Sequence, residues 1–303
     1  MISNPATLGA RIKAAHSLTA MDPVTTHRLT NRNQAEVLAF LSERPLHTAV
    51  MFGLISDNGI ESNLNRGCFY GWRGSNGRLE GVALIGHLIL MEVRSDAALG
   101  EFARLAQGLE RCHMILGEQD VIARFWELYR EGGQPRRHVG RELLWELTDS
   151  PRLADTCDGL RRATLDDLSL IVPIHAALAM AESGVNPLDQ DRHGFEMRCR
   201  RRILQGRTWV LAAGGQLIFK ADVVSESPSV SYLEGVHVHP EKRGRGYGSC
   251  CIAEMSRDLL QRSGSITLLV NEQRHAAQRF FRKLGFIWRA TYDTMFLQER
   301  NYL

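Results

Sequence analysis

The sequence predicts an α/β (α+β) protein of two domains, each built of both strands and helices. The first observation is length, because 303 residues exceed one typical domain and suit two of about 150. The second is that short segments with strand periodicity alternate with longer segments of helical periodicity in both halves. The third is a polar, turn-rich stretch at residues 151–159, which we predict to be the linker.

Composition and charge are those of an ordinary globular protein. With 44% hydrophobic and 23% charged residues the chain can bury a core, and a net charge of +3 gives no support to nucleic-acid binding. The six cysteines show neither C-x-x-C spacing nor a metal-ligand pattern with histidine. No apolar run reaches the ~18 residues of a membrane span, and an apolar signal core is missing at the start. We therefore expect a reduced, cytoplasmic protein without metal or membrane.

The N-terminal half, residues 27–150, is predicted to follow a loose tail at 1–26. Apolar residues at helical spacing and the cap candidate Asn31 predict a helix that ends before Pro45. The predicted elements in order are helices at 31–43 and 46–55, strands at 67–72, 79–85 and 88–93, a helix at 96–109, a strand at 113–116, a helix at 120–129 and a strand at 141–147.

The C-terminal half, residues 160–303, starts with a predicted strand at 160–162 and a helix at 168–180, which Pro173 can kink. Residues 182–191 are predicted to be a loop, followed by a helix at 193–205. We interpret the arginines of that helix as a solvated face: Arg198, Arg200, Arg201 and Arg202. Three strands follow at 209–213, 217–224 and 231–238, with a hairpin turn at Gly214 and Gly215 between the first two.

A glycine-rich turn after the last of these strands predicts a phosphate site. The strand cannot continue through Pro240, and apolar residues return at helical spacing from Ile252. Between them lie Gly244, Gly246 and Gly248. Glycines let backbone N–H groups approach an anion, and the start of the following helix directs unpaired N–H groups at it. The spacing matches neither G-x-x-x-x-G-K-[ST] nor G-x-G-x-x-G.

This turn resembles the acetyl-CoA pyrophosphate loop of the GNAT N-acetyltransferase superfamily, Q/R-x-x-G-x-G/A. The matching residues are Arg243, Gly246 and Gly248, preceded by Val238 and Pro240. A second stretch, residues 266–286, is similar to the family's next strand, its CoA-side helix and the terminal G-F pair. The resemblance covers roughly residues 160–303.

The resemblance implies two tandem GNAT-like domains, each a mixed, mostly antiparallel twisted sheet flanked by helices. The N-terminal half has nearly the same element order, but residues 93–99 offer no glycine loop. We therefore expect this half to be a degenerate copy of unknown function without its own cofactor, and to complete the sheet like an internal dimer or close a cleft. The assembly is expected to be a monomer or a homodimer.

The activity that the resemblance implies is transfer of an acetyl group from acetyl-CoA to a primary amine by direct attack. The acceptor class stays open between a small molecule, such as an amino acid or polyamine, and a protein amine. An unpaired backbone N–H near Val238 would bind the developing oxyanion. By the same resemblance, the cofactor contacts are Val236, Val238, Arg243, Gly244, Arg245, Gly246, Tyr247, Gly248, Ser249, Asn271, Arg274 and Phe281.

For the general base the candidates are Glu234 and His237. An acid in an apolar sheet can have a raised pKa, which suits Glu234 to proton transfer near neutrality, although it is equally well a structural partner of an arginine. Because side chains alternate along a strand, only one of the two should face the cleft unless a bulge intervenes.

Two positions depart from the family pattern. Phe281 replaces a tyrosine that can protonate the leaving thiolate, and Arg274 replaces an asparagine; Tyr292, Tyr247 or water would have to act instead. This leaves two alternatives, a non-catalytic acyl-CoA sensor and a longer-chain N-acyltransferase. Glu182, Asp189 and Asp191 would favour a cationic acceptor.

Overall fold

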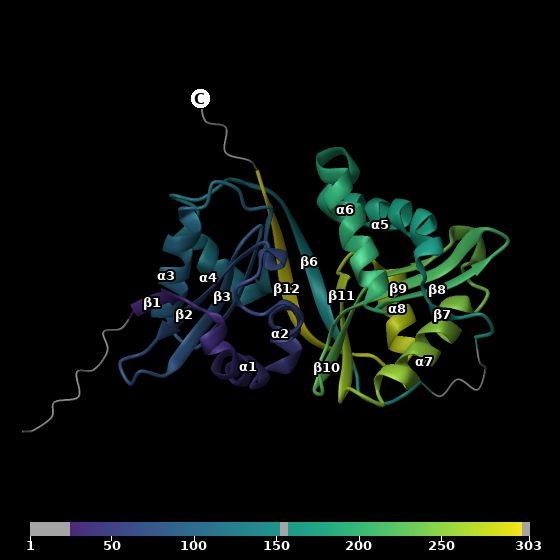
Figure 1. Ribbon diagram of the computed structural model, residues 1–303, viewed down its shortest axis with the longest axis horizontal. Coiled ribbons are helices and arrows are strands. Elements are labelled where there is room, and N and C mark those ends of the chain that lie inside the picture. Colours follow the sequence, from purple (N-terminus) through teal and green to yellow (C-terminus); the bar gives the residue numbers. More distant parts are fainter. Residues whose placement is uncertain (1–24, 152–156, 299–303) are drawn as a thin grey trace, which may run out of the picture.

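A single twelve-stranded sheet runs through both halves of the chain in the computed structural model, which describes residues 25–151 and 157–298 (Figure 1). The strand order is β1-β2-β3-β4-β5-β12-β6-β11-β10-β9-β8-β7. Neighbouring strands are mostly antiparallel, and the parallel pairs are β4–β5 and β10–β11. Helices cover both faces, which confirms the predicted fold class.

The two halves repeat one order of elements. The first contains β1 (Thr25–Arg28), η1 (Asn31–Asn33), α1 (Gln34–Ser42), α2 (Pro45–Asn58), η2 (Asn63–Asn65), β2 (Gly67–Arg73), β3 (Leu79–Gly86), β4 (Leu88–Val93), α3 (Asp96–Gln107), β5 (Met114–Glu118), α4 (Gln119–Tyr129) and β6 (Arg136–Leu147). The second contains β7 (Arg161–Arg162), η3 (Leu165–Asp167), α5 (Leu168–Ser183), α6 (Pro187–Leu204), β8 (Thr208–Ala213), β9 (Gln216–Glu226), β10 (Val230–Val238), η4 (Pro240–Lys242), α7 (Tyr247–Leu259), β11 (Ser265–Asn271), α8 (His275–Lys283) and β12 (Ile287–Leu297).

The last strands of the two halves are exchanged. Strand β6, from the first half, pairs with β11, and strand β12, from the second half, pairs with β5. The two exchanged strands also pair with each other, so that Glu142 lies opposite Tyr292 (Figure 1). The N-terminal half thus completes the sheet like an internal dimer. Each half of the sequence contributes its last strand to the sheet of the other half.

Because side chains alternate along a strand, the two faces of each strand pack against different helices. In β3, Val82 and Leu84 pack under α1 and α2, while Ala83 and Ile85 face α3 and α4. Because of the exchange, Met295 of β12 belongs to the core of the first half. In return, Trp145 and Leu147 of β6 belong to the core of the second half.

The two halves also meet through α2. Gly53 lies so close to Ser225 of β9 that an added Cβ would be 2.3 Å from its hydroxyl oxygen. Arg201 of α6 donates to Asn58, and Arg207 pairs with Asp57. These contacts hold α2 against the second half beside the exchanged strands.

The structure corrects several element predictions. Residues 182–191 are mainly helical, because Asn186 caps α6 and a kink at Asp191 takes the place of the expected loop. Thr30 rather than Asn31 is the first cap, and it precedes a 3-10 turn. The tail at 1–26 lies outside the described residues except for Thr25 and Thr26, which are in β1. Among the described helices, none combines the length and apolarity that crossing a bilayer requires.

We predict that Met295→Ala destabilises the first half although Met295 belongs to the second. Its side chain is 4% exposed, and truncating a buried Met costs about 2–5 kcal/mol of unfolding free energy. Hydrogen exchange should show faster exchange in α3 and α4. Met197→Ala, at a site 48% exposed, is the control. Loss of protection confined to the second half would contradict the exchange.

Candidate active site

The candidate site lies where β10 and β11 separate. Their parallel pairing spans Val230–Leu233 against Ser265–Leu268. Strand β10 then continues to Val238 and β11 to Asn271 without further pairing between them. The backbone of residues 235–238 therefore has one edge free of β11, which is where the sequence predicts an oxyanion-binding N–H.

The predicted phosphate loop follows this edge. Gly244 (φ +73°) and Gly246 (φ +88°) adopt left-handed conformations, and neither would have an atom near an added Cβ. Gly246 caps α7, and its carbonyl accepts the first helical bond, from Cys250. The earlier N–H groups of the helix have no carbonyl of their own helix to bind. The loop is thus an open cradle of N–H groups, which fits a pyrophosphate.

Side chains around the loop complete this surface. Arg243 donates from Nε to the carbonyl of Val238 at 3.1 Å, which fixes its stem along the loop, while Arg245 is exposed. Tyr247 and Ser249 lie in the first turn of α7 and are half-buried. An added Cβ on Gly248 would be 3.1 Å from Val238 and 3.3 Å from Phe280, so α7 and β10 approach closely there.

The helix α8 brings Phe280, rather than Phe281, to the loop. Phe281 is 5% exposed and packs edge-on against Phe280 and Phe286 in the core. Sequence reasoning did not single out Phe280. Arg274, at the start of α8, is exposed, and Asn271 donates from Nδ2 to Glu142 at 3.2 Å. Asn271 and Arg274 therefore border the cleft from the β11 side.

A β-bulge in β10 brings both candidate bases to one face. Glu234 pairs with Asp222 and His237 with Lys220, so three steps on β10 match two on β9. Gly235 provides the bulge with φ +60°. Because paired residues share a face, Glu234 and His237 both point to the side of Lys220 and Asp222. The bulge overturns the expectation that only one of them faces the cleft.

A buried charge network supports the bulge. Lys220 is 0% exposed and contacts Asp222 and, at 2.9 Å, Nδ1 of His175. Asp222 also accepts from Arg202 at 3.1 Å and from Thr208 at 2.8 Å. Burial alone would raise the pKa of Asp222, but Lys220 and Arg202 hold it well below its usual range.

This network corrects the interpretation of the 193–205 helix as a solvated arginine face, because Arg202 points inward. It also keeps His175 neutral: burial, helped by Lys220, lowers its pKa to about 4. An added Cβ on Gly235 would be 2.7 Å from Lys220 Nζ. The ammonium group therefore lies directly beneath the bulge that positions Glu234.

Three carboxylates from three elements face the separated strands. Glu234 is joined by Glu182, at the end of α5, and by Glu142 of the exchanged strand β6. Burial raises the pKa of Glu234 and of Glu142, although the side chain of Glu234 is exposed to solvent. Burial and repulsion by Glu234 raise the pKa of Glu182 to about 7, although its side chain keeps contact with solvent. Among the described residues, none of the three forms an ion pair.

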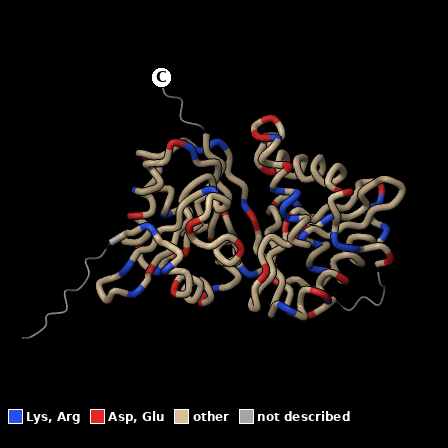
Figure 2. Tube along the Cα trace, in the orientation of Figure 1, with Lys and Arg blue, Asp and Glu red and all other residues tan. Residues whose placement is uncertain are grey.

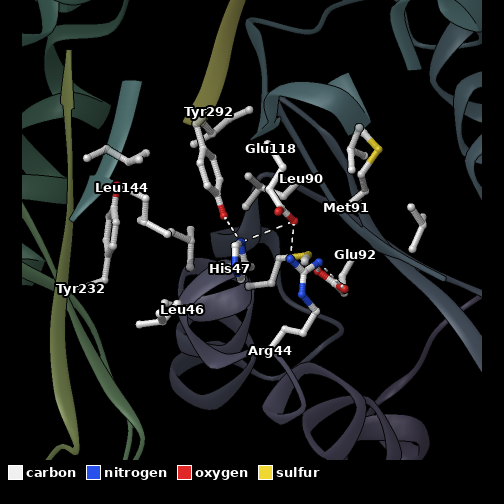
Figure 3. Close-up of a pocket in the computed structure, with 18 residues that line it drawn as sticks. Arg44, Leu46, His47, Leu90, Met91, Glu92, Glu118, Leu144, Tyr232 and Tyr292 are labelled. Carbon is white, nitrogen blue, oxygen red and sulfur yellow. Dashed lines mark hydrogen bonds and ion pairs between the residues drawn. The ribbon is translucent and has the colours of Figure 1, made fainter. Parts of the chain in front are cut away.

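The other acids of the predicted cleft border and Tyr292 lie elsewhere. Asp191 accepts from the N–H of Gly194 and pairs with Arg198, while Asp189 binds Asn186. Tyr292 is held on the N-terminal side, where its hydroxyl meets Nδ1 of His47 at 2.8 Å (Figure 3). The structure thus does not bring Tyr292 together with Glu234, which removes the geometric support for Tyr292 as the acid.

The equivalent separation in the first half, between β4 and β5, is filled. Arg44 reaches in from the start of α2 and pairs with Glu92 and Glu118 (Figure 3). His47 lies 3.4 Å from Glu118. The cavity that remains has a volume of about 40 Å³, enough for only two or three water molecules.

We predict that Gly246→Val weakens acetyl-CoA binding by at least about tenfold, because a β-branched residue resists φ +88° and covers the cradle. Gly214→Val is the matched control, since Gly214 also has positive φ and open space but lies in a hairpin turn. Calorimetric titration measures both. Equal acetyl-CoA binding by the two variants would contradict the assignment of this loop as the phosphate-binding site.

We predict that Asp222→Asn lowers the unfolding free energy by about 3–5 kcal/mol, because it leaves Lys220 and Arg202 without their counter-charge. Urea unfolding measures the loss. Asp258→Asn, which breaks partly exposed pairs with Arg162 and Arg262, should cost no more than about 1 kcal/mol. Similar costs for the two variants would show that the network contributes little.

Comparison with known proteins agrees with this geometry. Residues 220–295, which span the bulge, the loop and α8, match the family described as FR47-like protein. No curated protein matches the chain. A Drosophila protein of solved structure shares 15% identity at a TM-score of 0.70, over 92% of this chain and 100% of its own.

Two further solved structures carry descriptions. A GNAT-family acetyltransferase from Colwellia psychrerythraea is 12% identical at a TM-score of 0.56, over 91% of this chain and 99% of its own. A tandem GNAT protein from the clavulanic acid biosynthesis pathway is 14% identical at a TM-score of 0.54, over 92% and 100%. At these identities the likeness concerns the fold. By its fold, the chain is similar to proteins of the GNAT superfamily, including one of the tandem type.

Proposed function

We propose that this protein is an N-acetyltransferase that moves the acetyl group of acetyl-CoA to a primary amine by direct attack. One observation carries the proposal: the free edge of β10, the glycine cradle and the bulge that presents Glu234 lie consecutively on one segment, residues 234–248. Acyl transfer needs a held thioester, a donor to its carbonyl oxygen and an acceptor for the amine proton. This segment offers a candidate for each.

The phosphate end of the cosubstrate would be held by the N–H groups of residues 244–249, with Arg243 and Arg245 adding positive charge. Toward the reacting carbon, the N–H groups of Val236 and Val238 are the candidates for stabilising the oxyanion. Asn271, Arg274 and the ring of Phe280 border the same space from α8 and β11.

For the base we propose Glu234. As the nitrogen–carbon bond forms, Glu234 takes a proton from the amine, and the carbon–sulfur bond breaks to release a thiolate. The raised pKa of Glu234 places its proton affinity closer to neutrality, which suits a base that must also release the proton again. His237, on the same face, is the second candidate. Its pKa is lowered by burial and by Arg243, so that it stays neutral and able to accept.

The thiolate requires a proton that Phe281 cannot supply. Among the residues predicted for this role, Tyr247 in the first turn of α7 remains beside the loop, and water is the alternative. The core position of Phe281 also favours a second candidate function, a non-catalytic acyl-CoA-binding module. Titration with acetyl-CoA, CoA and a long-chain acyl-CoA, followed by an amine screen, separates these functions. Binding without turnover would favour the module, and a preference for the long chain would favour longer acyl transfer.

We predict that Glu234→Gln lowers kcat/KM by about 10²–10⁴-fold and removes the acid limb of its pH profile. The sign follows from the raised pKa: the wild-type base becomes ionised, and the rate rises, as pH increases through that pKa. Glu182→Gln is the control. Glu234 ionises first and raises the pKa of Glu182 to about 7, so Glu182 is neutral while Glu234 titrates, and replacing it should leave the limb nearly in place. An unchanged limb in Glu234→Gln would reject Glu234 as the base.

A further inference from the structure

A group of basic residues from both halves meets above the exchanged strands. We call it the interface basic cluster: Arg66, His87, His113, Arg137 and Arg198. The rings of His87 and His113 stack in parallel with centroids 5.0 Å apart. Arg137 lies over the ring of Phe296, at 5.8 Å from its centroid, and His113 meets the same ring edge-on. These contacts hold the cluster together without any anion.

The positive charge of the cluster is poorly compensated. Among the described residues, neither Arg66 nor Arg137 forms an ion pair. Asp191 acts on Arg66 from a distance, but it already accepts from Gly194 and pairs with Arg198 at 3.3 Å. Elsewhere in both halves basic and acidic residues are interspersed (Figure 2). The cluster is therefore a local excess of positive charge.

The pKa values of His87 and His113 reflect the excess positive charge. Burial, together with the charges of Arg66, His113 and Arg198, lowers the pKa of His87 to about 3. Burial also lowers the pKa of His113, with Arg137 and Arg66 contributing. Both rings are thus neutral at neutral pH and offer an N–H donor each rather than a charge. A bound oxyanion would meet arginine charges and imidazole donors together.

Arg66 is held in an unusual backbone conformation. Its φ is +55°, in the left-handed region, and among the described residues no other side-chain-bearing residue has positive φ. Its carbonyl accepts from the N–H of His87 at 2.9 Å, which ties it to the turn before β4. Glycine would suit this position better, so the conformation carries a cost that a role for the guanidinium would explain.

Two observations connect the cluster to the group formed by Glu142, Glu182 and Glu234. His138 and Glu142 share one face of β6, four residues apart, and His138 stacks on Phe296. That spacing corresponds to roughly 13 Å along the strand. Arg137 also reaches the end of α5, since an added Cβ on Gly184 would be 3.3 Å from its Nη1. Glu182 is two residues before that glycine.

We propose that the interface basic cluster binds an oxyanion of the acceptor, a phosphate or a carboxylate, while the acceptor's amine lies among the three glutamates. This assignment rests on the proposed function. It defines the acceptor as an amine that also carries an anionic group at a distance from the nitrogen. Arginine forks bind phosphate and carboxylate in two-pronged geometry, and the neutral imidazoles add donors. The first half thereby recognises the substrate without holding a cosubstrate of its own.

The test uses the full chain and two probes, inorganic phosphate and acetate, at constant ionic strength. NMR signals of the His87 and His113 rings should shift in a saturable manner, and the stronger probe identifies the preferred oxyanion. Arg66→Gly removes the guanidinium while relieving the left-handed strain, so the thermal midpoint should stay equal or rise. Binding should weaken by about tenfold or more. Arg104→Gln, at an exposed pair on α3, is the control and should bind like wild type.

Ring signals that do not respond to either probe, or that respond equally in Arg66→Gly, would overturn the proposal. Titration with acetyl-CoA is carried out separately on the same variants. Its failure would count against the proposed function and leave the oxyanion measurement standing. With any acceptor found by the amine screen, Arg66→Gly should raise KM about tenfold or more and leave kcat unchanged. An unchanged KM would contradict an anionic acceptor.

Discussion

The exchange of β6 and β12 is the constraint on which the rest of the structure depends. Every other strand pairs within its own half, but the four central strands β5, β12, β6 and β11 alternate between halves. Neither half can close its sheet or its core alone, because Met295 and Trp145 are each buried in the core of the other half. The chain therefore has the pairing of a strand-swapped dimer, with both copies on one polypeptide.

This exchange also places different side chains at equivalent positions of the two halves. Glu142 and Tyr292 face each other across the two exchanged strands, so equivalent sheet positions supply a carboxylate to one cleft and a phenol to the other. On the Tyr292 side, His47 and Arg44 fill the space between β4 and β5. On the Glu142 side, the space between β10 and β11 stays lined by acids. That the first half is degenerate stays a prediction from its missing glycine loop.

The local parts of the site could be predicted from the sequence. Gly244 and Gly246 take positive φ and precede a helix, as glycines at that spacing after a strand indicate. The base candidates could also be predicted, but their orientation depends on a β-bulge, and a single glycine such as Gly235 is not enough to predict one. Lys220 and Asp222 carried an overlooked signal, since two charges at i and i+2 in an apolar strand must share one face.

The remaining parts depend on contacts that sequence patterns do not show. The arginines of α6 have the pattern of a solvated face, and only the proximity of Asp222 makes Arg202 different from Arg201. The exchange of strands cannot be predicted from sequence patterns for the same reason, because the pairing of segments about 150 residues apart produces no local sequence pattern. Phe280 and Phe281 are adjacent and chemically equal, so which ring meets Gly248 follows from how α8 packs.

Electrostatics gives the two halves a joint role at the cleft. The network beneath Gly235 has two cations, Lys220 and Arg202, and one anion, Asp222, so it fixes the bulge and its excess positive charge partly offsets Glu234. The three glutamates then leave the inner cleft negative, and Arg66 and Arg137 leave its rim positive. Because Glu142 and Arg137 both come from β6, the first half sets part of the charge at each end. A substrate that bridges the two ends, as we propose, would be recognised only by the strand-exchanged chain, so the first half would contribute to recognition.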